Sequence, residues 1–260
     1  MRSIIYYFSG TGNNLALSKQ LAQELENTDV LSITSLLTNK TIPSCYDRIG
    51  FVAPSYYLHV PPIVGEALKN LVIEKDKIIF SIIGCGGNRG HAVEDIRELL
   101  LASNCNINYE FIVIYPGSYI LSYNASPKWY QSIVINHSYK KIKKIASIIN
   151  INSPDIKLNK SFLYNPKLEP RLQESIKNYA TNVSKYTVSD ECILCETCKK
   201  ICPAQNISIS DGKVTFDSNC QQCMACIQFC PKHAIDMDNI SAKRKRYHHP
   251  DISVKDLYQR

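Results

Sequence analysis

Apolar runs alternate with amphipathic segments along the first 150 residues. Short runs rich in Ile, Val, Phe and Tyr predict buried strands, and the segments that follow them repeat apolar positions with helical spacing, as at Leu15, Leu21 and Leu25. Five strands separated by helices predict an α/β domain with a parallel sheet covered on both faces. The predicted strands span residues 3–9, 30–34, 49–54, 77–83 and 108–115, and the predicted helices span 14–25, 61–71, 90–103 and 126–150.

The rest of the chain divides into three parts. Residues 151–186 contain three prolines and then a helical pattern, without the Gly/Ser composition of a flexible linker, so we expect a packed, partly helical connector. Residues 187–240 hold short apolar stretches on either side of an Asp211-Gly212 turn, which predicts a hairpin. Residues 241–260 form a basic tail.

Eight of the eleven cysteines lie between residues 192 and 230, in two runs of equal spacing. Residues 192–203 read CILCETCKKICP, and residues 220–231 read CQQCMACIQFCP. Both follow the iron–sulfur pattern C-x2-C-x2-C-x3-C-P, and together they form an internal repeat in which Cys220 corresponds to Cys192. The N-terminus lacks the apolar region of a secretory signal, which favours metal ligation over disulfides. Zinc is the alternative, although zinc motifs require neither these offsets nor the repeated proline.

The spacing also predicts which cysteines share a cluster. Three cysteines at intervals of three wrap three corners of one [4Fe–4S] cube, and the fourth cysteine of each run crosses to the other cube. The first predicted ligand set is Cys192, Cys195, Cys198 and Cys230, and the second is Cys220, Cys223, Cys226 and Cys202. Of the remaining cysteines, we interpret Cys45 and Cys105 as structural thiols, while Cys85 lies in a loop discussed below.

These two runs resemble the two-cluster bacterial ferredoxins. The resemblance covers residues 187–240 and implies a small α+β module of hairpin and helices with pseudo-twofold symmetry. It also implies two low-potential [4Fe–4S] clusters and a role in electron transfer.

The loop after the first predicted strand carries small residues with side-chain donors, and a helix follows it directly. Backbone N–H groups at a helix N-terminus, with Ser, Thr and Asn side chains, form an anion site. The loop lacks the lysine of a P-loop, and Leu15 replaces the third glycine of GxGxxG. We therefore predict a phosphate site of neutral donors. Its residues are Ser9, Gly10, Thr11, Gly12, Asn13 and Asn14.

This loop resembles the FMN phosphate loop of flavodoxins, whose pattern is close to Ser/Thr-x-Thr-Gly-Asn-Thr. The resemblance implies a flavodoxin-like sheet of order 2-1-3-4-5 that binds FMN where strands 1 and 3 meet. It also places the loops after strands 3 and 4 around the isoalloxazine ring. The FMN-binding residues that it implies there are Pro54, Ser55, Tyr56 and Tyr57 in one loop and Gly84, Cys85, Gly86, Gly87 and Asn88 in the other.

Several loop residues have a second interpretation. Tyr56 or Tyr57 stacks on the flavin, or both are ordinary surface aromatics in a chain with 16 tyrosines. The glycines let the backbone approach a planar ring, or they form only a strand-to-helix turn. For Cys85 we favour a buried small residue over a redox thiol, and for His59 a polar loop position over acid catalysis. Residues 115–119 would form a third wall of the site.

Charge is unevenly distributed along the chain. The formal charge is +7 in total, −3 in residues 186–240 and +4 in residues 241–260. A basic tail can dock an acidic partner, anionic lipid or nucleic acid. No stacking platform or recognition helix accompanies the charge, so we interpret the tail as solvated and expect no nucleic-acid partner. No apolar run is long enough to span a membrane, and the default expectation is a cytoplasmic location.

The two halves together resemble the fused flavodoxin–ferredoxin proteins of anaerobes. This resemblance spans nearly the whole chain and implies FMN, two [4Fe–4S] clusters and redox partner proteins such as ferredoxin-linked oxidoreductases. We expect an electron carrier. The alternative is a flavin-dependent oxidoreductase that uses NAD(P)H or ferredoxin to reduce a small substrate, although the sequence has no dinucleotide-binding fingerprint. A nucleic-acid-binding module with structural clusters is the third interpretation.

Overall fold

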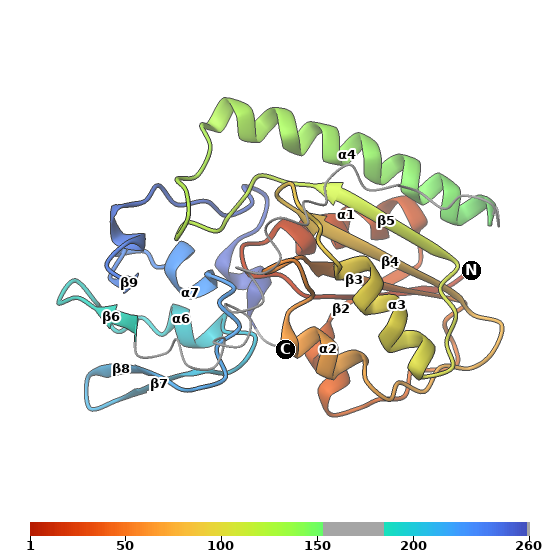
Figure 1. Cartoon of the computed structure of the whole chain (residues 1–260), viewed down its shortest axis with the longest axis horizontal. Helices are drawn as coiled ribbons and strands as arrows, with labels where there is room; N and C mark the ends of the chain where they lie inside the picture. The colour runs from red at the N-terminus through yellow and green to blue at the C-terminus, as the bar shows by residue number, and fades with distance from the viewer. Residues whose placement is uncertain (153–184, 259–260) are drawn as a thin grey trace.

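The computed structural model describes residues 1–152 and 185–258 (Figure 1). The first stretch folds around a five-stranded parallel sheet of order β2-β1-β3-β4-β5. This is the order that the resemblance to flavodoxins implies, so the predicted fold is confirmed. The strands are β1 (Ser3–Tyr7), β2 (Thr28–Ser32), β3 (Arg48–Pro54), β4 (Ile78–Cys85) and β5 (Tyr109–Ile114).

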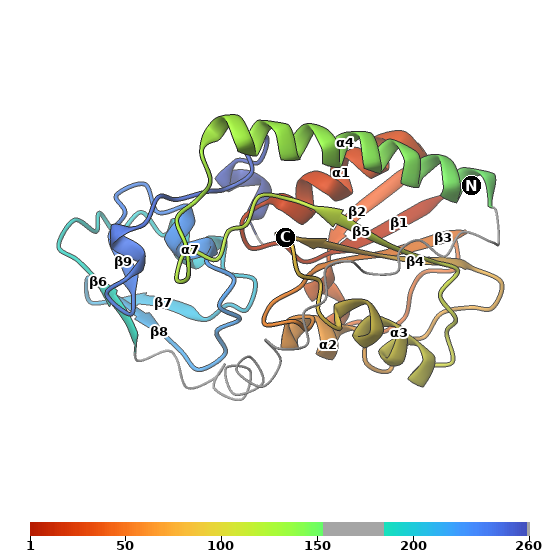
Figure 2. The same ribbon diagram turned by 45° about the horizontal axis from the view of Figure 1, so that its top comes forward.

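Helices cover both faces of the sheet (Figure 2). The helices α1 (Asn13–Leu25) and α4 (Lys128–Ile151) lie on one face, and α2 (Pro62–Leu68) and α3 (Ala92–Ala102) lie on the other with the 3-10 turn η1 (Ile33–Leu37). Successive side chains of a strand point to opposite faces. The central strands β3 and β4 are buried along their whole length, so each builds two cores at once.

Several predicted strand boundaries differ from the structure, and two of the differences have local reasons. The second strand ends at Ser32 and not at residue 34, because the Ser32 hydroxyl accepts a hydrogen bond from Thr34 N (3.4 Å) and caps η1. The fourth strand runs two residues further than predicted, because Gly84 pairs with Pro54 on one side and Val113 on the other.

The cysteine-rich module contains two antiparallel strand pairs and two short helices. The pairs are β6 (Tyr186–Val188) with β9 (Ile235–Met237) and β7 (Ile207–Ser210) with β8 (Lys213–Phe216), and the helices are α6 (Thr197–Lys200) and α7 (Ala225–Gln228). The predicted Asp211-Gly212 turn joins β7 to β8. The internal repeat is visible in the backbone, because positive φ values recur at equivalent positions of its two halves. These pairs are Leu194 with Gln222, Glu196 with Met224, and Gln205 with His233.

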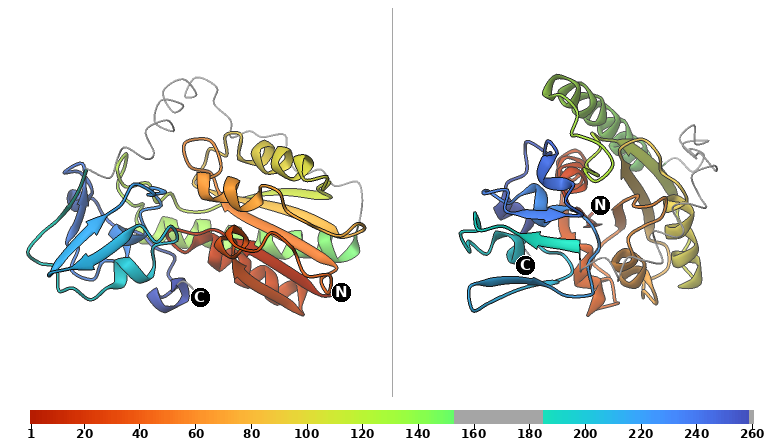
Figure 3. Two further views of the ribbon diagram at one scale, coloured as in Figure 1. Left: turned by 90° about the horizontal axis from the view of Figure 1, so that it is seen from below. Right: turned by 60° about the vertical axis from the view of Figure 1, so that its left-hand side comes forward.

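The module lies beyond the carboxyl ends of the parallel strands, beside the sheet domain (Figure 1; Figure 3, left view). Parallel α/β sheets bind ligands at this edge, where the strand order reverses. The module therefore faces the loops in which the sequence predicts the phosphate and flavin sites.

The C-terminal segment 245–258 returns to the sheet domain, and this corrects the expectation of a solvated tail. Three of its apolar side chains, Tyr247, Ile252 and Leu257, are buried. The net positive charge is misleading because the Arg246 side chain is held by backbone groups of the module. The Arg246 guanidinium donates hydrogen bonds to the carbonyl oxygens of Ile227, His233 and Ile235 in the module. Lys19 of α1 pairs with Asp256, which also closes a capping box at η5 (Val254–Leu257).

The predicted packed connector at 151–186 lies almost entirely outside the described residues. Within residues 1–152 and 185–258, no helix is long and apolar enough to cross a membrane.

The C-terminal segment contains a fully buried histidine whose environment requires the neutral ring. His249 Nδ1 accepts a hydrogen bond from Asp251 N (3.3 Å), and the ring packs against Tyr115 and Tyr139. Burial lowers the pKa of His249 from 6.5 to about 4. Below about pH 6.5 the unfolded chain therefore binds a proton that the folded chain excludes. The free energy of unfolding decreases as the pH falls from about 6.5 towards 4.

We predict that His249→Phe weakens the acid dependence of stability. The wild type should lose about 2 kcal/mol at pH 5 through this one group, and the variant should lose none of it. Urea unfolding followed by circular dichroism at pH 7 and pH 5 measures the difference. His137→Phe, on the exposed side of α4, is the control and should keep the wild-type dependence because it leaves His249 and its contacts in place. Parallel profiles for the wild type and His249→Phe would contradict the prediction.

Candidate redox site

The eight cysteines of the two runs line two separate cavities. The cavity lined by Cys192, Cys195, Cys198 and Cys230 contains the whole first predicted ligand set. The cavity lined by Cys202, Cys220, Cys223 and Cys226 contains the whole second set. The fourth cysteine of each run has therefore crossed to the other cavity, as the spacing predicts. The four thiols of each set surround a space, and no three Cys, His, Asp or Glu side chains in the described residues converge on a single point.

Backbone N–H groups point at the sulfurs in the same way in both halves of the module. Asn206 N donates to Cys202 Sγ at 3.3 Å, and at the equivalent positions of the second half Ala234 N donates to Cys230 Sγ at 3.4 Å. Gln222 N donates to Cys220 Sγ at 3.3 Å. Such N–H···S bonds stabilise negative charge on the thiolate and on anything it ligates, and they raise reduction potentials.

The two cysteine cavities differ in their distance from solvent. At the first cavity Cys195 is exposed, and its neighbours Ile193 and Leu194 also lie at the surface. At the second cavity Cys226 is buried, and Cys223 packs against the core of the sheet domain. The first cavity is the outer one, and the second faces the loops of the sheet domain.

The loop of residues 9–14 has the geometry of an anion site. Gly12 is the residue before α1 and has a left-handed backbone (φ 91°), and no side chain caps the helix. The first intrahelical bond runs from Ala16 N to Gly12 O, which leaves the preceding amides of the first turn without a helical partner. Free amides and the helix dipole attract an anion at this end of α1.

The two asparagines of this loop hold it in place with their side chains. Asn14 is buried, and its side-chain amide donates to Phe8 O (3.1 Å). The Asn13 side chain donates to Pro116 O (3.2 Å) and accepts from the Tyr247 hydroxyl (2.6 Å). The side-chain donors that remain in the loop are the hydroxyls of Ser9 and Thr11.

The carboxyl edge of the sheet holds two adjoining cavities that share eight lining residues. The smaller one, about 90 Å³, adjoins the phosphate loop, and the larger one, about 520 Å³, extends away from it. Fourteen of the fifteen predicted FMN residues line one or both cavities. The exception is Gly12, on which the Ile252 side chain packs. Burial raises the pKa of the Cys85 thiol, which agrees with the favoured interpretation of a small buried residue.

Further lining residues come from elements that the sequence did not connect with the site. The predicted third wall is present at residues 115–119, and it continues through Ser122 and Tyr123 to Tyr130 on α4. Gln222, Cys223 and Met224 of the module line the same cavity. Their positions depend on tertiary packing between distant segments, for which one sequence carries no local signal.

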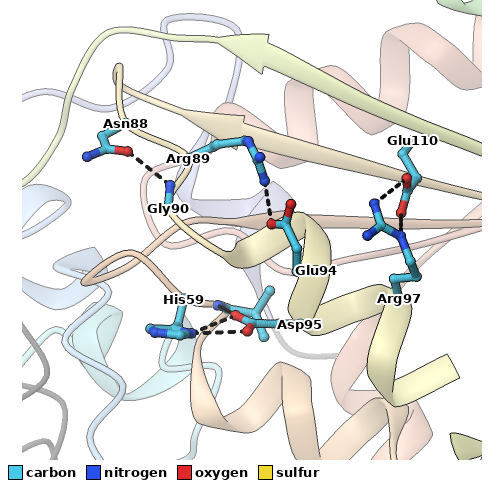
Figure 4. A network of polar contacts seen from close by, with 9 residues as sticks. His59, Asn88, Arg89, Gly90, Glu94, Asp95, Arg97 and Glu110 are labelled. Atoms are coloured by element: carbon cyan, nitrogen blue, oxygen red, sulfur yellow. Dashed lines mark hydrogen bonds and ion pairs between the residues drawn. The ribbon is translucent and has the colours of Figure 1, made fainter. Parts of the chain in front are cut away.

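The loops around the cavities are fastened to helix α3 by polar contacts (Figure 4). The Asp95 carboxylate accepts hydrogen bonds from Val60 N (2.9 Å) and His59 Nδ1 (3.0 Å). His91 N donates to Leu58 O (2.6 Å), so the loops after β3 and β4 are joined directly. His59 holds a loop, as its polar loop assignment predicts.

Comparisons with known proteins address the two parts of the chain separately. Residues 184–244 match the model of the 4Fe-4S dicluster domain family. The chain joins a flavodoxin-like domain to a dicluster ferredoxin domain. A comparison with curated protein sequences finds no match.

Several solved structures are similar to parts of the chain at low sequence identity. A flavodoxin of Streptococcus pneumonia TIGR4 has 13% identity and a TM-score of 0.41, covering 59% of this chain and 100% of its own. An FMN-dependent NADH-azoreductase of Bacillus anthracis has 9% identity and a TM-score of 0.40, covering 57% and 99%. A putative quinone reductase of Klebsiella pneumoniae has 10% identity and a TM-score of 0.41, covering 65% and 93%. At these scores the flavodoxin-like assignment rests on the strand order.

The dicluster domain contacts the phosphate loop at Gly10. A Cβ atom at Gly10 would lie 2.2 Å from Cys223 O and 2.8 Å from Cys223 Cβ, so only glycine permits this approach. Polar contacts surround it: Ile63 N donates to Gln221 Oε1 (3.0 Å), and the Tyr57 hydroxyl bonds both Tyr119 and Gln222.

The C-terminal segment completes this interface from the other side. His249 N donates to Thr11 O (2.8 Å), and Tyr247 N donates to Gln228 Oε1 (2.8 Å) of the dicluster domain. The same Gln228 side chain donates to Ser118 O (2.9 Å) of the flavodoxin-like domain. One glutamine therefore links three segments that are far apart in the sequence.

We predict that Gly10→Ala destabilises the protein, because the new methyl group must displace the Cys223 backbone. Overpacking of this kind costs about 1–3 kcal/mol. Gly65→Ala in α2 is the matched control, because its added Cβ meets open space. We expect that control to be neutral or stabilising by about 0.5–1 kcal/mol. Urea unfolding measures both, and equal effects of the two substitutions would contradict the role assigned to Gly10.

Proposed function

We propose that this protein is an electron-transfer flavo-iron–sulfur protein. It passes electrons between FMN in the flavodoxin-like domain, two [4Fe–4S] clusters in the dicluster domain, and external redox proteins. One observation carries the proposal: Cys223, a predicted cluster ligand, packs on Gly10 of the phosphate loop and also lines the predicted flavin cavity. The second cluster and the flavin would thus share a wall.

The residues present fit two clusters. Each cavity is lined by four cysteines from both runs, and N–H groups point at ligand sulfurs in each half of the module. The first set would hold the cluster nearer the surface, and the second set would hold the cluster nearer the flavin. Electrons would then move along one path, from the surface at Cys195 through Cys223 to the flavin.

The residues present also fit FMN. The amides before Ala16 and the hydroxyls of Ser9 and Thr11 would hold the phosphate, and the loops at 54–57 and 84–88 would hold the ring. FMN, when bound, exchanges one or two electrons, while each cluster exchanges one. The chain contributes a rigid cradle: Asp95 fixes one ring loop, and Tyr57 ties it to Tyr119.

The wider setting follows from the resemblance to the fused flavodoxin–ferredoxin proteins of anaerobes. We place the protein in that family, with a cytoplasmic location and ferredoxin-linked oxidoreductases as partners. The second candidate is a flavin-dependent reductase of a small substrate, and the large cavity of about 520 Å³ favours it. Rapid bleaching of the flavin by NADH or NADPH would select that candidate.

Cofactor content after anaerobic purification tests the proposal. We expect about eight iron, about eight acid-labile sulfide and about one FMN per chain. Cys195→Ser should lower iron and sulfide by up to about half while FMN stays bound, because Cys195 belongs to the outer set. Cys45→Ser is the control and should change nothing, since Cys45 is exposed and lies outside both runs.

Two results would overturn parts of the proposal. Full iron with no FMN, even after incubation with excess FMN, would contradict the proposal that the protein binds FMN and the assignment of its FMN-binding residues. Full iron in Cys195→Ser together with iron loss in Cys45→Ser would remove the ligand assignment.

A further inference from the structure

The larger cavity extends past the loops assigned to the flavin. Its outer end is bounded by the segment between β5 and α4 and by the first turns of α4. Ser122, Ser126, Tyr130 and Val134 line this end, and none of them lines the smaller cavity beside the phosphate loop. The outer end is therefore additional space on the side away from the phosphate site.

The lining of this cavity is aromatic and uncharged. None of the described residues that form its wall is Asp, Glu, Lys, Arg or His. Rings of Tyr57, Tyr119, Tyr123 and Tyr130 face it, and hydroxyl groups supply hydrogen-bond donors between them. Such a wall suits a planar, uncharged ring that carries a few hydrogen-bond acceptors. It offers no cation for the phosphates of a nicotinamide dinucleotide.

Large apolar side chains stand at the surface beside the outer end. Trp129 is 67% exposed, and Tyr130 is 46% exposed. The rings of Trp129 and Tyr130 meet edge to face with centroids 5.9 Å apart. Exposed apolar residues next to a cavity commonly mark a ligand entrance.

The inner end of the same cavity reaches the cluster ligands. Gln222, Cys223 and Met224 of the dicluster domain line it, together with Tyr56 and Gly86 of the predicted flavin loops. A molecule in the outer end would thus share one enclosure with both redox sites.

We propose that the outer end of this cavity binds a quinone-type molecule, a planar uncharged ring with two carbonyl oxygens, as an electron acceptor. Its reduction rests on the proposed function. Two electrons arrive from the flavin and clusters, and an external redox protein then reduces these centres again. Two protons arrive from solvent through the open end. The two carbonyl groups become hydroxyl groups, and no bond to the protein forms. Tyr130 and Ser126 supply hydroxyl donors for the carbonyl oxygens, and Tyr123 supplies a stacking surface.

Trp129 is the single tryptophan of the chain, so its fluorescence reports binding beside Tyr130. Menadione, a small uncharged naphthoquinone, is titrated into the protein loaded with FMN and clusters. We expect saturable quenching, and we expect 1,2-naphthoquinone-4-sulfonate to bind at least tenfold more weakly because the wall holds no cation. Val134→Lys, which places a charge on the wall, should weaken menadione binding at least tenfold. Ile133→Lys, at the neighbouring position and outside the wall, should change it less than twofold.

The outcomes separate this inference from the proposed function. Absence of saturable quenching in a protein with full FMN and iron would overturn the inference and leave the electron-transfer function intact. Equal weakening by Val134→Lys and Ile133→Lys would contradict binding at this site. Loss of menadione binding when FMN is loaded would also contradict it, since FMN alone would then fill the cavity. As a second readout, menadione should reoxidise the chemically reduced protein more slowly in Val134→Lys than in Ile133→Lys.

Discussion

The close approach of Cys223 to Gly10 is the constraint on which the rest of the architecture depends. A single hydrogen in place of a side chain lets the backbone at Cys223, a predicted cluster ligand, lie directly on the predicted phosphate loop. Electron transfer between protein centres slows steeply with distance, so direct contact between these two loops would keep the proposed cofactors close together. In the proposed function, this contact would let the two domains act as one redox unit.

The loops that would hold the cofactors are shaped by the protein itself. Asp95 anchors the loop after β3, and Asn13 ties the phosphate loop to the segment after β5. Tyr57 and Tyr119 join the loop after β3 to that segment, because their hydroxyl oxygens lie 2.7 Å apart in a hydrogen bond. Because these loops are already held in place, little of the binding free energy is needed to order them.

The sequence predicts those features that depend on local spacing. The strands and helices follow from apolar periodicity, and the crossed cysteine sets follow from the offsets within two short runs. It does not predict features that depend on packing between distant segments. The positive charge of residues 241–260 suggests a solvated tail, yet Arg246 is engaged by carbonyl oxygens. Gly10 and Gly12 look equivalent in the phosphate loop, but each makes room for a different distant side chain or backbone, Cys223 and Ile252.

The packing of residues 245–258 on the phosphate loop bears on the order in which parts of the chain fold during synthesis. Contacts such as Tyr247 with Asn13 and Asp256 with Lys19 join positions near the two opposite ends of the chain. During synthesis the ribosome releases the phosphate loop long before its covering segment exists. Domains fold as they emerge, whereas contacts of such long range form late. We therefore expect the sheet domain to fold with its phosphate loop uncovered while the cysteine runs are synthesised, and residues 245–258 to cover the interface last.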